Sequence, residues 1–264
     1  MKFSMMTYTL MRQKGFTPFD CIRIASELKM SGIDWVTTYG QSPAELRKRC
    51  DDAGLPVAAH TFFLRRFMAG ENDWQSEAMR SLDDAVGLEA PVVMIPPIPL
   101  PGITTAVENR KRWIAALAEV APPAAERNLV LTVENFPGVL SPFVTASDFH
   151  AAQREVPALK LTFDNGNAAT GEDQLASLHA CAKDIAHVHF KDWRRSAVPA
   201  ADFRPMRDGC HYSPALIGEG VIDSRATLRE LEAIGYQGFI NIEYEGDRHR
   251  ADRAVKQALD YLKS

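Results

Sequence analysis

Four side chains able to hold a metal ion end four β-rich runs in the second half of the sequence. They are Glu134, Asp164, His189 and Glu243. In each run apolar and polar residues alternate, and the polar set ends in the carboxylate or the imidazole. Alternate side chains of a strand point to opposite faces, so each polar set shares a face with its terminal group. Crowded carboxylates repel one another unless a cation neutralises them, and the pattern therefore predicts a divalent metal site.

The donor set indicates which metal ions suit the predicted site. Three carboxylates and one imidazole favour a hard or borderline ion, and we expect Mn²⁺, with Mg²⁺, Co²⁺ or Zn²⁺ as alternatives. The set contains no cysteine, which argues against a purely structural zinc site. A metal with open coordination positions polarises carbonyl oxygens, so the pattern predicts a centre for Lewis-acid catalysis.

Strand-like and helical patterns alternate along the whole chain, as in parallel βα units. The predicted strands are 2–8, 34–39, 57–63, 92–96, 129–134, 160–164, 185–191 and 239–243. Thr17-Pro18 and Ser42-Pro43 each predict a helix start, with a capping hydroxyl before a first-turn proline. Eight such units in roughly 250 residues predict an α/β fold, a single-domain (β/α)₈ TIM barrel over residues 1–264. Active sites of such barrels lie at the carboxyl ends of the strands, where the four groups fall.

Composition and charge narrow the class of ligand. The chain has 264 residues, of which 46% are hydrophobic, and a net charge of -4, so a basic surface for nucleic acid is not expected. No G-x-G-x-x-G or Walker A motif predicts a nucleotide cofactor, and the four cysteines form no C-x-x-C pair. No signal peptide or membrane span is predicted. We expect a cytoplasmic homodimer or homotetramer that acts on a small sugar or polyol ketone, without nucleic-acid or membrane partners.

One connection is unusually long. Residues 192–222 separate the seventh strand from its helix. Long βα connections in barrels form lids, substrate walls or subunit contacts, and a tolerated surface insertion is the alternative.

Five motifs resemble the xylose isomerase-like sugar (phosphate) isomerase/epimerase family. They are Leu131-Thr-Val-Glu-Asn135, Leu161-Thr-Phe-Asp-Asn165, Ala186-His-Val-His-Phe-Lys-Asp192, Gly218-Glu-Gly220 and Gly238-Phe-Ile-Asn-Ile-Glu243. In that family an ordered Glu, Asp, His and Glu bind one divalent metal, which implies Glu134, Asp164, His189 and Glu243 here. Its ketose 3-epimerases use the two metal-bound glutamates as acid and base, so the resemblance implies catalytic roles for Glu134 and Glu243. Proton abstraction beside a chelated carbonyl would give an enediolate.

Two positions depart from the epimerase pattern. The epimerases carry a histidine three residues after the metal-binding aspartate and a second glutamate six residues after the first, where this chain has Asn167 and Leu140. The family's arginine six residues beyond the metal-binding histidine is matched by Arg195. The resemblance therefore implies substrate contacts for Asn167 and Arg195, with a specificity different from that of the ketohexose 3-epimerases.

Two further residues are predicted to bind substrate from their positions in strands. His60 lies in the inward register near the end of the third strand, with a bond to a backbone carbonyl as the alternative role. Lys191 shares the register of His189, with a salt bridge to Asp164 or Glu219 as the alternative. Glu219, between two glycines, is expected to shape a turn. His187, one layer below His189, is expected to support the site and not to bind the metal.

These observations favour a metal-dependent isomerase or epimerase of a sugar, sugar phosphate or polyol ketone. A lyase of the inosose or dehydroshikimate dehydratase type is the alternative, because loss of a β-hydroxyl can follow the same enediolate. An endonuclease IV-like phosphodiesterase is less favoured, since its three-zinc cluster needs more strand-end histidines than a chain with seven His provides. A non-catalytic sugar-binding barrel would be expected to have lost part of the ligand set.

Overall fold

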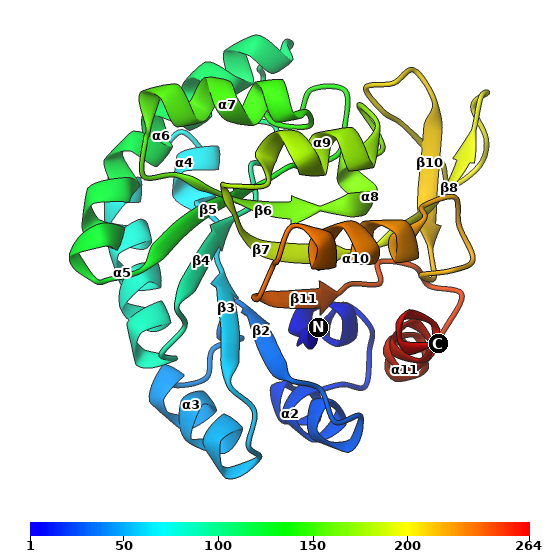
Figure 1. The fold of residues 1–264 in the computed structure, drawn as a ribbon. Coiled ribbons are helices and arrows are strands. Elements are labelled where there is room, and N and C mark those ends of the chain that lie inside the picture. The colour runs from blue at the N-terminus through cyan, green and yellow to red at the C-terminus, as the bar shows by residue number, and fades with distance from the viewer.

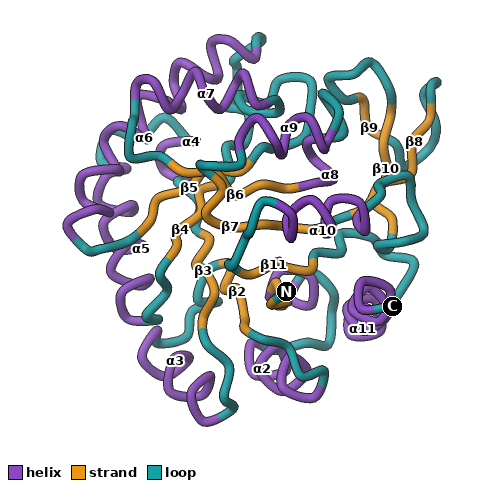
Figure 2. Tube along the Cα trace, viewed as in Figure 1, coloured by secondary structure: helices purple, strands orange, loops and turns teal.

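Eight parallel strands close into a barrel in the computed structural model, which describes residues 1–264, and helices surround it (Figures 1 and 2). Neighbouring strands follow the order β1, β11, β7, β6, β5, β4, β3, β2. Their bounds are β1 Lys2–Met6, β2 Gly32–Val36, β3 Val57–Thr61, β4 Val92–Ile95, β5 Val130–Glu134, β6 Lys160–Asp164, β7 Ile185–Phe190 and β11 Phe239–Ile242. The predicted (β/α)₈ barrel is confirmed.

The helices include long ones that pack outside the barrel and short ones at strand ends (Figure 1). They are α1 Thr7–Met11, α2 Pro18–Glu27, α3 Pro43–Asp52, α4 Arg65–Met68, α5 Trp74–Gly87, α6 Ala106–Glu126, α7 Ala146–Glu155, α8 Asn165–Ala168, α9 Gln174–Cys181, α10 Ser224–Ala233 and α11 Ala251–Lys263. The predicted cap of α2 is present, since Thr17 Oγ1 accepts the backbone N–H of Asp20. Ser42 stands at the N-cap of α3, but its side chain makes no capping bond. No helix has both the length and the apolar composition needed to cross a membrane.

The main hydrophobic core lies between the barrel and the helices. Outward-facing strand residues such as Met5, Trp35 and Val93 pack against apolar helix faces. Within the barrel the layer below the strand ends is polar, and the hydroxyls of Thr132 and Thr162 are 2.7 Å apart. All cysteines are free thiols, and three of the four are buried. Helix packing thus stabilises the barrel while its interior remains available for polar side chains.

Strand β2 is shorter than predicted. It ends at Val36, and the backbone φ angles of Thr37 and Tyr39 are 60° and 50°. A residue with positive φ cannot continue an extended strand, so the predicted end at residue 39 is wrong.

The long connection forms a separate antiparallel sheet beside the barrel mouth (Figure 1). Its strands are β8 Asp192–Ser196, β9 Arg204–Pro205 and β10 His211–Ala215, in the order β8, β10, β9. The Asp192 carboxylate accepts backbone N–H groups of Gly218, Gly220 and Ile222 at 2.9 to 3.0 Å. Glu219 therefore lies in a turn that this carboxylate holds, as expected.

A second attachment joins this sheet to the helical layer. Arg207 donates to the Asp148 carboxylate of α7 at 2.6 Å and to the carbonyl of Ser141. Arg110 of α6 donates to the same carboxylate. Residues 192–222, which we call the excursion, are therefore held at two places, through Asp192 and through Arg207. This favours a fixed wall over a loose surface insertion.

Candidate metal centre

Strands β5, β6, β7 and β11 bring four side chains that could hold a metal ion together at the carboxyl end of the barrel. These are the residues expected from the sequence, Glu134, Asp164, His189 and Glu243. The four residues are buried, and one candidate ligand atom from each lies within 4.8 Å of all the others. Because the four strands are neighbours, the ligands form a single cluster.

Two asparagines that follow the ligand strands hold the strand ends in place. The Asn135 carboxamide accepts the backbone N–H of Asp164 and donates to its carbonyl oxygen, both at 2.8 Å. Asn165 accepts the backbone N–H of Lys191 at 3.1 Å. These bonds join β5 to β6 and β6 to β7, so the spacing of three of the ligands is fixed by the backbone.

The donor atoms fit a divalent cation. Asp164 Oδ2 and Glu243 Oε2 are buried and accept no hydrogen bond. Burial raises the pKa of Asp164 to about 7 and the pKa of Glu243 well above its usual value, and Lys191 only partly offsets this. Three buried carboxylates that share a single ammonium need a further cation for all of them to remain ionised, and oxygen-rich donor sets suit ions such as Mn²⁺.

Lys191 places an ammonium group among the same carboxylates. Its Nζ lies 3.0 Å from Glu243 Oε2, 3.5 Å from Asp164 Oδ2 and 3.7 Å from Glu245 Oε1. Although burial opposes the charge, the surrounding carboxylates raise the pKa of Lys191 well above its usual value. The alternative expected from the sequence, a salt bridge to Asp164, is present, whereas Glu219 pairs with His249 instead.

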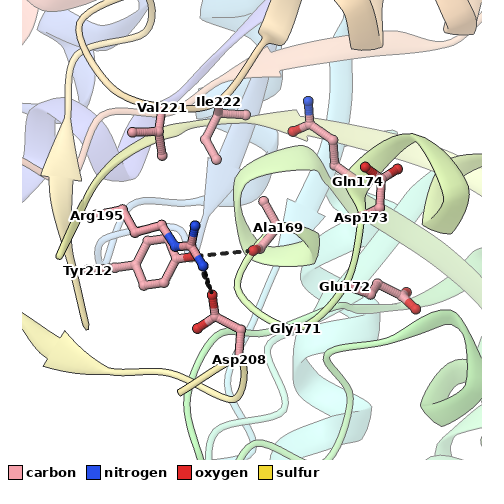
Figure 3. A pocket seen from close by; sticks show the side chains of 10 residues that line it. All are labelled: Ala169, Gly171, Glu172, Asp173, Gln174, Arg195, Asp208, Tyr212, Val221 and Ile222. Carbon is pink, nitrogen blue, oxygen red and sulfur yellow. Dashed lines mark hydrogen bonds and ion pairs between the residues drawn. The ribbon is translucent and has the colours of Figure 1, made fainter. Parts of the chain in front are cut away.

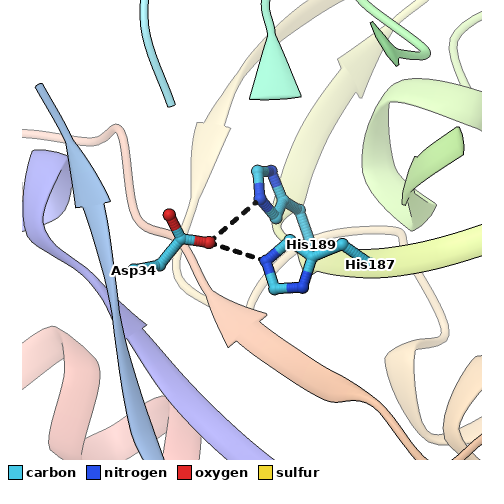
Figure 4. Close-up of side chains that lie close together, drawn as sticks. All are labelled: Asp34, His187 and His189. Carbon is cyan, nitrogen blue, oxygen red and sulfur yellow. Dashed lines mark hydrogen bonds and ion pairs between the residues drawn. The ribbon is translucent and has the colours of Figure 1, made fainter. Parts of the chain in front are cut away.

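An aspartate from the opposite side of the barrel lies behind the ligand His189 (Figure 4). Asp34 Oδ2 is 2.6 Å from His187 Nε2 and 3.7 Å from His189 Nε2, and it accepts a bond from Asn241 at 3.1 Å. Burial opposes ionisation, but hydrogen bonds from the histidines lower the pKa of Asp34. His189 thus presents Nδ1 to Glu134, 2.8 Å away, and Nε2 to Asp34. His187 takes the supporting position expected for it.

A cavity of about 150 Å³ opens over the cluster. It is lined by Met6, Tyr8, Val36, Thr61, Phe63, Met94, Pro96, Ile98, Glu134, Phe136, Lys191, Glu243 and Glu245. The charged residues come from β5, the end of β7 and the segment after β11, and the apolar residues come mostly from the first four strands and the loops beyond them. A small ligand in this cavity would have carboxylates and an ammonium on one side and apolar side chains on the other.

His60 does not face this cavity, and the predicted inward register is wrong. The pairing of β2 with β3 shifts by one residue at Ala58, so His60 pairs with Trp35 and Thr61 with Val36. Trp35 belongs to the outer core, whereas Val36 and Thr61 line the cavity. His60 Nδ1 lies 3.1 Å from the carbonyl oxygen of Trp35, and burial lowers the pKa of His60 to about 4.

The two residues implied by the family pattern have different surroundings. Asn167 is buried on α8, its backbone N–H donates to Asp164 Oδ1 at 2.7 Å, and neither atom of its carboxamide has a hydrogen-bond partner. Arg195 points away from the metal ligands into another cavity of about 480 Å³, where it pairs with Asp208 at 3.1 Å beside Tyr212 (Figure 3). The substrate contact expected of Arg195 is therefore not supported by its position.

Three residues at the site were not identified from the sequence. Asp34 and Glu245 share the inward register of Val36 and Glu243, so alternation along the strand and its continuation could have indicated them. Tyr8 follows the end of β1 within α1, where strand periodicity gives no information. Tyr8 and Glu245 both line the cavity.

Comparison with known proteins identifies one family, and the similar proteins are named for different reactions. Residues 19–264 match the family model of the xylose isomerase-like TIM barrel. An inosose dehydratase of Erwinia tasmaniensis is 26% identical over 254 residues, which cover 87% of this chain and 84% of that protein. The structure of a D-psicose 3-epimerase from Clostridium cellulolyticum H10 has a TM-score of 0.76 at 14% identity, covering 100% of this chain and 98% of the other. The IOLI protein with a binding zinc atom has a TM-score of 0.79 at 17% identity, covering 100% and 96%.

Proposed function

Because the chain belongs to the xylose isomerase-like TIM barrel family, we propose that it is a divalent-metal-dependent enzyme that isomerises or epimerises a sugar or polyol ketone through an enediolate. The observation that supports this most directly is the buried cluster of Glu134, Asp164, His189 and Glu243, whose three carboxylates exceed the positive charge that the surrounding side chains supply. When bound there, a divalent cation would supply Lewis acidity toward the carbonyl oxygen of the substrate.

Glu134 and Glu243 are the proposed proton carriers. They come from β5 and from the end of β11, which are separated in the barrel by β6 and β7. Each also lines the cavity, and because they enter it from strands that are not neighbours, they can approach a bound substrate from different directions. A carboxylate on one side removes the proton next to the ketone, and a carboxylic acid on the other side returns a proton to the opposite face.

Lys191 and Asn167 are the proposed substrate-binding residues. The ammonium of Lys191 lies in the cavity wall beside Glu243 and can donate to a substrate oxygen. The buried carboxamide of Asn167 has both a donor and an acceptor without partners, and a buried unpaired amide is costly unless a ligand satisfies it. Apolar residues such as Val36 and Met94 would exclude water from the carbon chain.

A dehydratase is the second candidate, supported by the similarity to inosose dehydratase over most of both chains. The same proton abstraction would then be followed by loss of a β-hydroxyl. Lys191, 3.0 Å from Glu243, could donate a hydrogen bond to the departing oxygen. The two candidates share the first step and differ in the fate of the enediolate.

Solvent exchange tests the shared step. The Mn²⁺-loaded protein is incubated in D₂O with a panel of ketoses and inososes, and carbon-bound deuterium is measured by NMR. We expect exchange with at least one panel member, with an epimer or isomer as product. A conjugated enone, visible by ultraviolet absorbance, would instead identify the dehydratase.

Variants connect the exchange to the cluster. Glu134→Gln and Glu243→Gln should abolish exchange. Glu219→Gln is the matched control, because Glu219 is exposed and pairs with His249 outside the cavity. Absence of exchange with every panel member, or full exchange in Glu243→Gln, would contradict the proposal.

A further inference from the structure

A second cavity adjoins the one over the metal ligands and is rich in arginine. Its volume is about 500 Å³, and the two cavities share Tyr8 and Glu245 as lining residues. We call it the arginine vestibule, and its charged lining residues are Arg12, Arg194, Arg204, Arg248, Asp202, Glu245 and Asp247. Four arginines and three acidic residues thus line a space next to the proposed reaction site.

Two of the four guanidinium groups are engaged by carboxylates. Arg12 donates to Asp247 at 2.9 Å and to the carbonyl oxygen of Gly246 at 2.8 Å. Arg204 lies over the ring of Trp193, and its guanidinium is 3.7 Å from Glu245 Oε2. This distance is too long for a strong hydrogen bond, so much of the N–H donor set of Arg204 is unused. Arg12 therefore shapes the wall, and Arg204 retains donors for a ligand.

The other two guanidinium groups have no carboxylate partner. Arg194 donates to Ser213 Oγ at 2.6 Å and lies over the ring of Phe203, while its Nε is buried without a partner. Arg248 lines the vestibule, and its one hydrogen bond runs from its backbone N–H to the Tyr244 hydroxyl, so its guanidinium has no partner. Guanidinium groups with free donors match the planar oxygens of carboxylate and phosphate.

We infer that the arginine vestibule binds an anionic group, a carboxylate or a phosphate, carried by the substrate at the end opposite the reacting ketone. The inference rests on the proposed function for its ketone end. Glu245 separates the two cavities, since its Oε1 is 3.7 Å from Lys191 and its Oε2 is 3.7 Å from Arg204. A substrate would have to extend past only one carboxylate to reach from the metal ligands to Arg204. A neutral inosose has no anionic group, so the N–H donors of these arginines would bind water instead.

Strand β8 provides a matched pair of variants. Arg194 pairs with Ser213 and faces the vestibule, whereas Arg195 pairs with Tyr212 and faces the other cavity (Figure 3). Arg194→Met and Arg195→Met therefore remove the same charge from adjacent positions on opposite faces of one strand. Arg248→Met is a second vestibule variant, and it removes no side-chain ion pair.

The experiment measures binding of inorganic phosphate and of malonate by calorimetry. It uses an Asp164→Asn background, which is expected to lose the metal site and so removes anion binding to a metal. We expect at least one anion to bind, less tightly as salt rises. Arg194→Met and Arg248→Met should each weaken binding by about tenfold or more, as expected for a lost charge-assisted hydrogen bond. Arg195→Met should leave it unchanged.

The two anions separate the two chemical sources, since tighter binding of phosphate indicates a phosphate ester and tighter binding of malonate indicates a carboxylate. Melting curves confirm that each variant is folded. Binding of neither anion, or equal binding to Arg194→Met and Arg195→Met, would overturn the inference. The readout needs no turnover, so failure of the deuterium-exchange assay would contradict the proposed function without affecting this result.

Discussion

The two halves of the barrel mouth are built from the same element and carry opposite chemistry. At the mouth, strands β5, β6, β7 and β11 present Glu134, Asp164, His189 and Glu243, whereas strands β1, β2, β3 and β4 present Met6, Val36, Thr61 and Met94. One half is therefore suited to a cation and to proton transfer, and the other to the carbon chain of a ligand. The difference shows that a symmetric fold positions an asymmetric site through the last inward residue of each strand.

The apolar half nevertheless contributes one polar side chain to the charged half. Asp34 lies two residues before Val36 on β2, and its carboxylate contacts both His187 and His189. A carboxylate behind a metal-binding histidine fixes the orientation of the ring and increases its basicity. The two halves are thus separate at the mouth and connected one layer below it.

The largest effect is expected from removing a ligand on the charged half. Asp164→Ala should abolish binding of Mn²⁺ measured by calorimetry, because it removes a buried carboxylate of the cluster that the chain cannot replace. The loss should exceed the ~10–100-fold typical of residues behind the ligands. Met94→Leu, a change of similar volume on the apolar half, should retain the stoichiometry of the wild type. Equal metal binding by Asp164→Ala would show that the cluster is not the metal site.

A smaller loss is expected where the halves connect. Asp34→Asn should weaken Mn²⁺ binding by about 10–100-fold, since the ligand histidine loses its charged partner. Ser4→Ala is the control, because Ser4 Oγ bonds to Asn241 and contacts neither histidine. A melting curve separates lost affinity from lost folding. If Asp34→Asn bound metal as tightly as Ser4→Ala, the aspartate would have only a packing role.

On the apolar half the expected change is in ligand binding alone. Val36→Ala removes two methyl groups from the cavity wall and should weaken binding of the substrate by about 1–3 kcal/mol. Mn²⁺ affinity should stay at the wild-type value, because the side chain of Val36 has no polar atom that could bind the metal or one of its four candidate ligands. A parallel fall in metal affinity would mean that the halves are not chemically separate.

The smallest effects are expected from helix caps outside the mouth. Thr17 caps α2 and Thr145 caps α7, each through a reciprocal bond with an aspartate three residues later. Thr17→Ala and Thr145→Ala should each lower the free energy of unfolding by about 1 kcal/mol and leave metal affinity unchanged.

Hydrogen bonds from Thr17 and Arg23 lower the pKa of Asp20 to about 2. The contribution of Asp20 to stability is therefore present above about pH 4 and is lost as pH falls toward 2. Urea denaturation above pH 4 and near pH 2 checks that this contribution to the free energy of unfolding is lost at the lower pH.

Alternating strand and helix patterns predicted the fold, and alternation within single strands predicted the candidate metal ligands. Glu134, Asp164, His189 and Glu243 each end an alternating run, and the structure brings all four together. His60 was misplaced because the extra residue Ala58 reverses the parity of β3, and no residue type near it indicates a bulge.

The vestibule could not be predicted in the same way. Its arginines come from the C-cap of α1, from residues 192–222 and from the segment after β11, so only the closed fold brings them together. The resemblance indicated Arg195, but the excursion forms a hairpin in which adjacent arginines face opposite sides. The residue at the proposed substrate end is therefore Arg194, one position earlier. Side chains on loops depend on loop geometry, which periodicity does not describe.

The attachment of the excursion through Arg207 and Asp148 affects how fast a ligand can enter and leave. The buried Asp148 carboxylate, shared by Arg207 and Arg110, holds this wall on α6 and α7. Entry should then be limited by encounter and orientation, with an association rate constant of about 10⁵ M⁻¹s⁻¹ or more, and not by opening of a lid. Stopped-flow traces of ligand binding should accordingly show one phase, and its observed rate constant should rise with ligand concentration without reaching a plateau.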